Sequence, residues 1–235
     1  HGVFGPGLEK EWESFVGQIP VPYVHGMTVG ELAMMTASQG WIQRSPKLHV
    51  VRMRGWHRGL LWDNLGLHWR PTSPNIPKAD SPYFYAMTGM LGGMTPVDIG
   101  IGTSRPFEYA GAAGVDPNEF SAVMNGYRFP GTRFVPFQSQ NRVGRDGSRI
   151  ESSIRGGADP VAIDVCCIFE LHRRTPGGLL SRMSGSGLSL FNKVYGSDRL
   201  EKALRSGGNP QRLIASWQSG NNHFRQQRQR FLLYP

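Results

Sequence analysis

The stretch of residues 15–33 constrains the fold more than any other, because it predicts where the first long helix begins. Prolines at the start of this stretch favour extended backbone. Thr28 and Glu31 then stand three residues apart, the spacing of a capping box, in which each side chain accepts a hydrogen bond from the other residue's backbone N–H. The sequence therefore predicts a helix from Thr28 to about Gln39.

Further helices and strands are expected without a regular alternation of the two. Residues 70–82 contain four prolines and are expected to form a stiff loop, because proline fixes φ and removes a hydrogen-bond donor. Residues 1–24, 89–102 and 175–190 are rich in glycine, proline or serine and are expected to be irregular. The pattern is typical of a single α+β domain. Helices are predicted near 57–65, 81–90, 116–125, 159–171, 197–204 and 209–224, and strands near 48–53, 132–137 and Ile150.

Composition limits the chemistry. The chain has 235 residues, of which 39% are hydrophobic, and no apolar run is long enough to cross a bilayer. Cys166 and Cys167 are adjacent, and neighbouring cysteines seldom pair, so no disulfide is expected. No metal-ligand spacing occurs, and neither a metal nor a cofactor is predicted.

The formal net charge is +9, which permits contact with an anionic surface. The basic residues are mostly scattered, as in many basic proteins with no such partner. Short clusters lie at Arg173-Arg174 and at Arg225, Arg228 and Arg230, and nucleic acid is a possible partner for the second cluster. No helix-turn-helix, RNA-recognition or zinc-finger pattern accompanies the cluster.

Several motifs resemble those of the NamZ/YbbC-like family, the exo-β-N-acetylmuramidases of bacterial peptidoglycan recycling. The first is His-Gly-Met-Thr-x-Gly-Glu-Leu-Ala at 25–33. The others are Met-x-Gly-Trp-x-Arg at 53–58, Gly-Leu-His-Trp with Pro-Thr-Ser-Pro-Asn-Ile-Pro at 66–77, Gly-Thr-Ser-Arg-Pro-Phe-Glu at 102–108, and Gly-Ser-Asp, Trp217 and Phe-Leu-Leu-Tyr in the tail. The resemblance runs nearly end to end, with a poor match at about 125–195.

The resemblance implies the family's C-terminal domain over 1–235, with a better matched part at 1–124, a divergent part at 125–195 and a helical part at 196–235. It also implies that the family's N-terminal Rossmann-like half is absent, so that another protein chain of a larger complex would have to supply it.

Candidate acids are few for a glycosidase, which normally uses two carboxylates. If the chain is active, the resemblance and the spacing make Glu31, Glu108 and His25 the catalytic candidates. Glu31 is better explained as the capping residue. Glu108 is as well explained as a partner of Arg105, and Asp98 as an ordinary loop acid.

A substrate-binding remnant is expected at six residues. His25 could serve as an acid or base near neutral pH, or could form a hydrogen bond to nearby backbone. The serine and asparagine of the proline loop could bind a sugar or its lactyl carboxylate, or could satisfy the loop's own backbone. Trp56, Trp62 and Trp69 could stack on a sugar, although packing is the commoner role. The six are His25, Ser73, Asn75, Asp98, Arg105 and Glu108.

The family's loop ahead of Pro-Phe-Glu usually carries a glutamate, an asparagine and an arginine. Here Gly93, Pro96 and Ile101 occupy those places. The main hypothesis is therefore a non-catalytic accessory subunit of an organellar assembly, in the mitochondrial matrix or on a membrane complex. One alternative is an active muramidase that releases N-acetylmuramic acid, in a bacterial periplasmic or secreted location. A weaker alternative is binding to RNA or another anionic surface.

Overall fold

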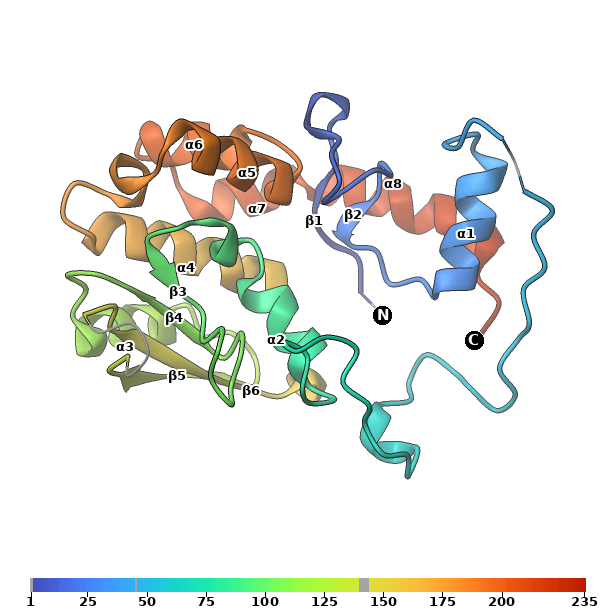
Figure 1. Cartoon of the computed structure of the whole chain (residues 1–235), viewed down its shortest axis with the longest axis horizontal. Coiled ribbons are helices and arrows are strands. Elements are labelled where there is room, and N and C mark those ends of the chain that lie inside the picture. Colours follow the sequence, from blue (N-terminus) through green and yellow to red (C-terminus); the bar gives the residue numbers. More distant parts are fainter. Residues whose placement is uncertain (1, 45, 140–143) are drawn as a thin grey trace.

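The structure is a computed structural model that describes residues 2–44, 46–139 and 144–235. Its main body is a four-stranded antiparallel sheet in the order β3-β4-β6-β5, covered by helices (Figure 1). A separate two-stranded antiparallel ribbon, β1-β2, joins this body to the end that carries α1. The strands are β1 Phe4–Gly7, β2 Pro22–Val24, β3 Val97–Asp98, β4 Tyr109–Ala112, β5 Thr132–Phe137 and β6 Gly147–Ser152.

The helices follow capping signals that can be read locally. Thr28, Asp116, Asp159 and Asn209 each accept a backbone N–H at a helix start, and proline follows three of them. The α-helices are α1 Val29–Ser38, α2 Ser81–Thr88, α3 Pro117–Gly126, α4 Pro160–Arg174, α5 Gly185–Tyr195, α6 Arg199–Arg205, α7 Pro210–Ser216 and α8 Gln218–Arg228. Short 3₁₀ turns lie at Lys10–Trp12, Trp62–Asn64, Leu91–Gly93, Ile154–Gly156, Leu179–Arg182 and Gln229–Phe231.

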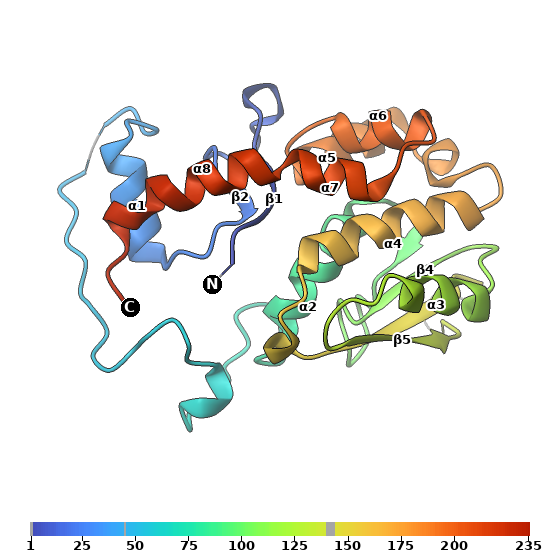
Figure 2. The ribbon, with the colours of Figure 1, turned by 180° about the vertical axis from the view of Figure 1, so that it is seen from behind.

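Helix α4 is the centre of the main core. Every residue from Pro160 to Leu171 is buried, as expected for a helix that is apolar on all sides. It contacts α2, α3 and α7 and lies between the sheet and the C-terminal helices (Figure 2). Cys166 and Cys167 are buried here as free thiols, as predicted.

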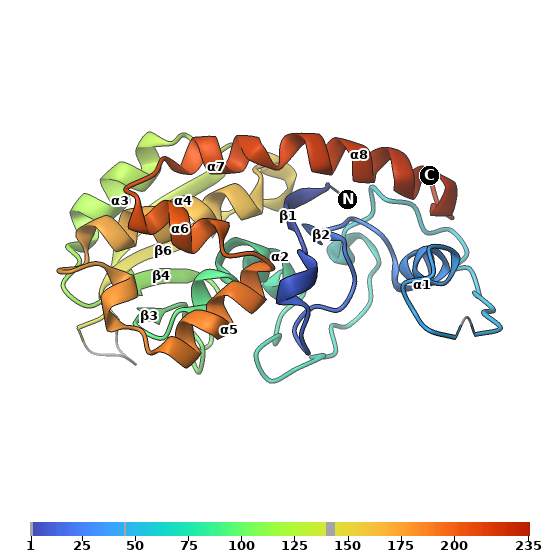
Figure 3. The same cartoon turned by 90° about the horizontal axis from the view of Figure 1, so that it is seen from above.

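A second, smaller core lies where α8 meets α1. Met35 of α1 and Phe224 of α8 are buried in it with Val3, Met27 and Phe231. Figure 3 shows α7 and α8 running along one edge of the molecule from the sheet to this end. The last predicted helix is therefore two helices, and the second of them connects the two cores.

Four expectations were wrong. The helix predicted near 57–65 is reduced to the 3₁₀ turn Trp62–Asn64. The first 24 residues are not wholly irregular, because β1 pairs with β2. The predicted strand at 48–53 does not form among the described residues, where residues 46–53 are extended without a ladder. The serine- and glycine-rich stretch before Tyr195 is largely helix α5, whose start is capped by Ser184. Among the described residues, no helix is both long and apolar enough to cross a bilayer.

Candidate functional site

The predicted acid Glu31 is a structural anchor. Its side chain is fully buried and completes the capping box with Thr28, whose N–H lies 2.8 Å from the Glu31 carboxylate. The same carboxylate accepts the N–H of Leu233 at 2.7 Å and forms an ion pair with Arg58. Burial raises the pKa of Glu31, but the bonds from Arg58, Thr28 and Leu233 outweigh it and leave the pKa below its usual value. A carboxylate held in this way is poorly placed to donate or take a proton.

His25 lies beside this anchor and faces a hollow of about 560 Å³. Its Nδ1 accepts the N–H of Met27 at 3.2 Å, an arrangement that places the remaining ring proton on Nε2. Burial and then the charge of Arg228 lower the pKa of His25, so the ring is neutral at pH 7. The carbonyl oxygens of His25 and Gly26 both accept from Arg228, which fixes the backbone at this point.

Glu108 and Arg105 are brought together, and Lys78 of the proline loop joins them. The Glu108 carboxylate is buried, 2.5 Å from Lys78 Nζ and 3.3 Å from Arg105 Nη1. In the sequence between Arg105 and Glu108, Phe107 has a φ of 71°, a left-handed backbone conformation that is rare for a residue with a bulky side chain. The prediction that Glu108 pairs with Arg105 is confirmed, and Lys78 is a partner that sequence reasoning missed.

The other predicted residues lie elsewhere. Asp98 is buried and accepts from the Gly100 N–H at 2.9 Å and the Ser139 hydroxyl at 2.6 Å, so it is not a solvated loop acid. The Ser73 hydroxyl accepts the N–H of Asn75 at 3.2 Å, which is the backbone-satisfying role that the sequence offered as an alternative. The six residues of the predicted remnant therefore do not converge on one point.

A second hollow, of about 500 Å³, adjoins the one beside His25. The two share Val24, Pro82 and Ala86 in their walls and lie between the β1-β2 ribbon and α2. The second hollow is lined by the exposed carboxylates Asp63 and Asp80. Neither has a hydrogen-bond or ion-pair partner among the described residues.

Aromatic rings border the same carboxylates. Trp62 and Tyr83 line the hollow, and Trp62 packs edge-to-face on Trp69 with ring centroids 5.0 Å apart. Sequence reasoning missed Asp63 and Asp80. Asp80 occupies the N-cap position of α2, where aspartate commonly caps a helix. Its side chain makes no capping hydrogen bond in this structure.

The basic cluster near the C-terminus is largely used inside the fold. Arg225 donates to the carbonyl of Val3 at 2.7 Å, and Arg228 is buried against the carbonyls of His25 and Gly26. Arg230 is exposed and lies over the Phe231 ring. The predicted nucleic-acid contact through these three residues stays a prediction, with Arg230 as its exposed member.

Two family models match the chain. The C-terminal model of exo-β-N-acetylmuramidase NamZ matches residues 83–234 and the N-terminal model matches residues 1–80. The chain therefore belongs to the NamZ exo-β-N-acetylmuramidase family, as the motifs predicted. The restriction to the family's C-terminal region was wrong, and an absent N-terminal half is not supported, because the N-terminal model covers residues 1–80.

Named relatives agree with this assignment. Peptidoglycan β-N-acetylmuramidase NamZ of Bacillus subtilis is 30% identical over 236 residues, covering 98% of this chain and 55% of that protein. A DUF1343 family protein of Bacteroides fragilis has a TM-score of 0.92 at 27% identity, covering 99% of this chain and 62% of its own. A second DUF1343 family protein of Bacteroides fragilis has a TM-score of 0.72 at 23% identity, covering 100% of this chain and 63% of its own. At this identity the likeness shows the fold alone. The chain spans about half the length of the curated relative.

These relationships define a glycoside hydrolase family directed at peptidoglycan. Neither they nor the structure support the accessory role or the organellar location predicted as the main hypothesis. The named relative is bacterial, which agrees with the bacterial alternative. The subdivision at residues 124 and 195 and the larger complex stay predictions.

Proposed function

We propose that this chain acts in the hydrolysis of β-N-acetylmuramides, releasing the terminal sugar from peptidoglycan fragments. The observation that carries the proposal is a hollow lined by two exposed carboxylates, Asp63 and Asp80, which have no hydrogen-bond or ion-pair partner in the described part of a chain of this family. Such enzymes normally use one carboxylic acid to protonate the leaving oxygen and a second carboxylate as base or nucleophile.

The surroundings of the two carboxylates suit a sugar. A hollow of about 500 Å³ admits a pyranose with its substituents, and the ring of Trp62 offers an apolar surface for the sugar face. Neutral His25, with a proton on Nε2, lines the adjoining hollow, where it can donate to a hydroxyl, amide or carboxylate of a ligand that extends into it.

The test is hydrolysis of a chromogenic β-N-acetylmuramide by the purified chain and its variants. We expect Asp63→Asn and Asp80→Asn each to lower kcat/KM by a factor of about 10³, in line with loss of an acid–base group and of transition-state charge stabilisation. Glu119→Gln is the matched control, because Glu119 is exposed on α3 and makes no side-chain contact among the described residues. Equal activity of the three variants would remove the two aspartates from the mechanism.

A second candidate is binding of muramyl sugars without hydrolysis. It is favoured by the fact that Glu31, Asp98 and Glu108, the acids that sequence reasoning selected, all have partners inside the fold. Saturable quenching of tryptophan fluorescence by N-acetylmuramic acid in the absence of hydrolysis would support this candidate. Quenching that survives Trp62→Leu would place the ligand elsewhere.

A further inference from the structure

The segment of residues 46–54 forms a cationic edge. Lys47, Arg52 and Arg54 are exposed along it, and none of the three has an ion-pair partner among the described residues. In Figures 1 and 2 the segment runs as an extended trace outside α1, at the end of the molecule away from the sheet. The side chains of all three cations are accessible to solvent.

No acidic residue balances this edge nearby. Between residues 32 and 62 the sequence contains no aspartate or glutamate, and α8 contains none either. Glu31 of α1 is the adjacent acid, but it is fully buried and paired with Arg58. By contrast, exposed cations of α6 at the other end of the molecule, such as Lys202 and Arg205, are paired with carboxylates. The segment is therefore a run of exposed cations with no acidic residue in the flanking sequence of residues 32–62.

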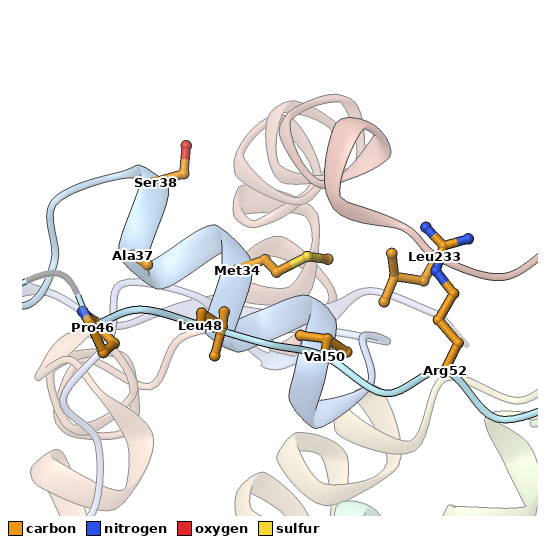
Figure 4. Close-up of a pocket in the computed structure, with 8 residues that line it drawn as sticks. All are labelled: Met34, Ala37, Ser38, Pro46, Leu48, Val50, Arg52 and Leu233. Carbon is orange, nitrogen blue, oxygen red and sulfur yellow. The ribbon is translucent and has the colours of Figure 1, made fainter.

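Apolar side chains alternate with the charges. Val51 is 81% exposed and Met53 is 51% exposed. Leu48 and Val50 turn the other way and line a groove of about 450 Å³ against α1, together with Met34, Arg52 and Leu233 (Figure 4). The extended backbone thus places Leu48, Val50 and Arg52 along the groove beside α1, while Val51 and Met53 stay exposed between the exposed cations Lys47, Arg52 and Arg54.

We propose that the cationic edge docks on an anionic lipid surface, with Lys47, Arg52 and Arg54 at the headgroups and Val51 and Met53 entering the interface. Exposed apolar side chains between cations suit an interface that is anionic outside and apolar beneath. A hydrophilic polyanion, such as nucleic acid, would leave the exposed apolar side chains of Val51 and Met53 unused. The protruding position suits a broad surface better than a narrow peptide.

The test is co-sedimentation of the purified chain with vesicles of phosphatidylcholine, with and without phosphatidylglycerol. We expect binding to the phosphatidylglycerol vesicles alone, weakened by salt. Because each basic residue near such a surface strengthens binding about fivefold, the triple variant K47Q/R52Q/R54Q should lose a factor of about 100. The variant V51S/M53S, which keeps every charge, should lose a factor of about 10.

The control is R133Q/R155Q/R212Q, which removes three exposed cations elsewhere and has the same net charge as the first triple variant. It should bind as the unaltered chain does. Circular dichroism of each variant checks that the fold is kept. The proposal is overturned if the two triple variants bind alike, if vesicles are not bound at low salt, or if polyphosphate binds as strongly as vesicles and V51S/M53S is unaffected.

Discussion

The carboxylate of Glu31 lies fully buried against the guanidinium of Arg58, and this pair joins segments that are far apart in sequence. Arg58 also donates to the carbonyl of Gly26 at 3.0 Å, and Glu31 accepts from Leu233 near the C-terminus. The family motif at 25–33 is thus a structural junction in this chain. Its buried acid Glu31 joins α1 to Arg58 and to the C-terminal tail.

The first prediction concerns this junction. Glu31→Gln removes the charge that pairs with Arg58 and should lower the free energy of unfolding by about 3 kcal/mol, because a mostly buried arginine side chain loses its charged partner. Urea denaturation measures the change. Glu9→Gln is the control, since Glu9 pairs with Arg199 on the surface at 2.8 Å and such pairs contribute about 1 kcal/mol or less. Similar losses in both variants would contradict the anchoring role.

The second prediction is the pH dependence of the same pair. The pKa of Glu31 is lower in the folded chain than its ordinary value of 4.5, so the stabilisation is fully present above about pH 4.5. It is lost as the pH falls from that value through the lowered folded-state pKa. The difference in unfolding free energy between the unaltered chain and Glu31→Gln should therefore shrink below pH 4.5. A difference that stays constant down to pH 3 would contradict this.

Helix-capping residues predicted where much of the helical structure begins, but the pairing of strands β1 and β2 was not predicted from the sequence. The capping hydrogen bonds of Thr28, Asp116 and Asp159 join residues at most three apart in sequence. Sequence pattern is therefore enough to predict where these helices begin. The β1-β2 ribbon pairs Phe4 with Val24, a contact set by the packing of the whole end of the molecule. Serine and glycine before Tyr195 suggested a loop, but burial of apolar side chains in α5 outweighs their low helix propensity.

The site was harder to predict than the fold. Motif residues were assigned to chemistry because they match a family pattern, yet Glu31 and Asp98 are occupied by backbone and side-chain bonds that no pattern reveals. Asp63 and Asp80 line the same hollow, whose wall also includes residues of α2 and of the N-terminal strands. Convergence of this kind depends on tertiary packing, which a single sequence does not display.

The third prediction concerns Asp164, which is fully buried in the main core. Its carboxylate accepts the N–H groups of Met90 and Leu91 at 2.8 and 2.9 Å. Asp164→Ala should cost about 3 kcal/mol, because two buried N–H groups lose their acceptor. Asp164→Asn keeps one acceptor oxygen and should cost clearly less, as thermal unfolding at constant pH would show.

The third prediction includes a pH dependence, with the opposite sign to that of Glu31. Burial raises its pKa well above the ordinary 3.8, so the folded chain holds this proton more tightly than the unfolded chain. Its contribution to stability therefore falls as the pH rises from 3.8 towards the raised folded-state pKa. Asp164→Asn should abolish that fall. An unchanged pH slope in the asparagine variant would show that the carboxyl group titrates normally.

The fourth prediction uses the backbone of Phe107. Its φ of 71° costs about 1 kcal/mol or more in any residue with a β-carbon, and glycine avoids that cost. Phe107→Gly should therefore be about 1 kcal/mol more stable than Phe107→Ala, although both lose the buried ring. Phe84 provides the control, because it is equally buried at 6% exposed but helical, so there alanine should be the more stable replacement. The same order at both sites would contradict the strain at Phe107.

The last prediction concerns a glycine pair between the two central strands of the main sheet, β4 and β6. Gly147 of β6 lies opposite Gly111 of β4, and a β-carbon on Gly147 would meet the Ala110 carbonyl oxygen at 2.1 Å. Backbone cannot yield as a side chain can, so Gly147→Ala should force the strands apart and cost at least about 2 kcal/mol. Gly220 of α8 has open space around the same position, and Gly220→Ala should stabilise the chain by up to about 1 kcal/mol. Opposite shifts of the urea midpoint in the two alanine variants would confirm that close approach, rather than glycine flexibility, fixes the residue at 147.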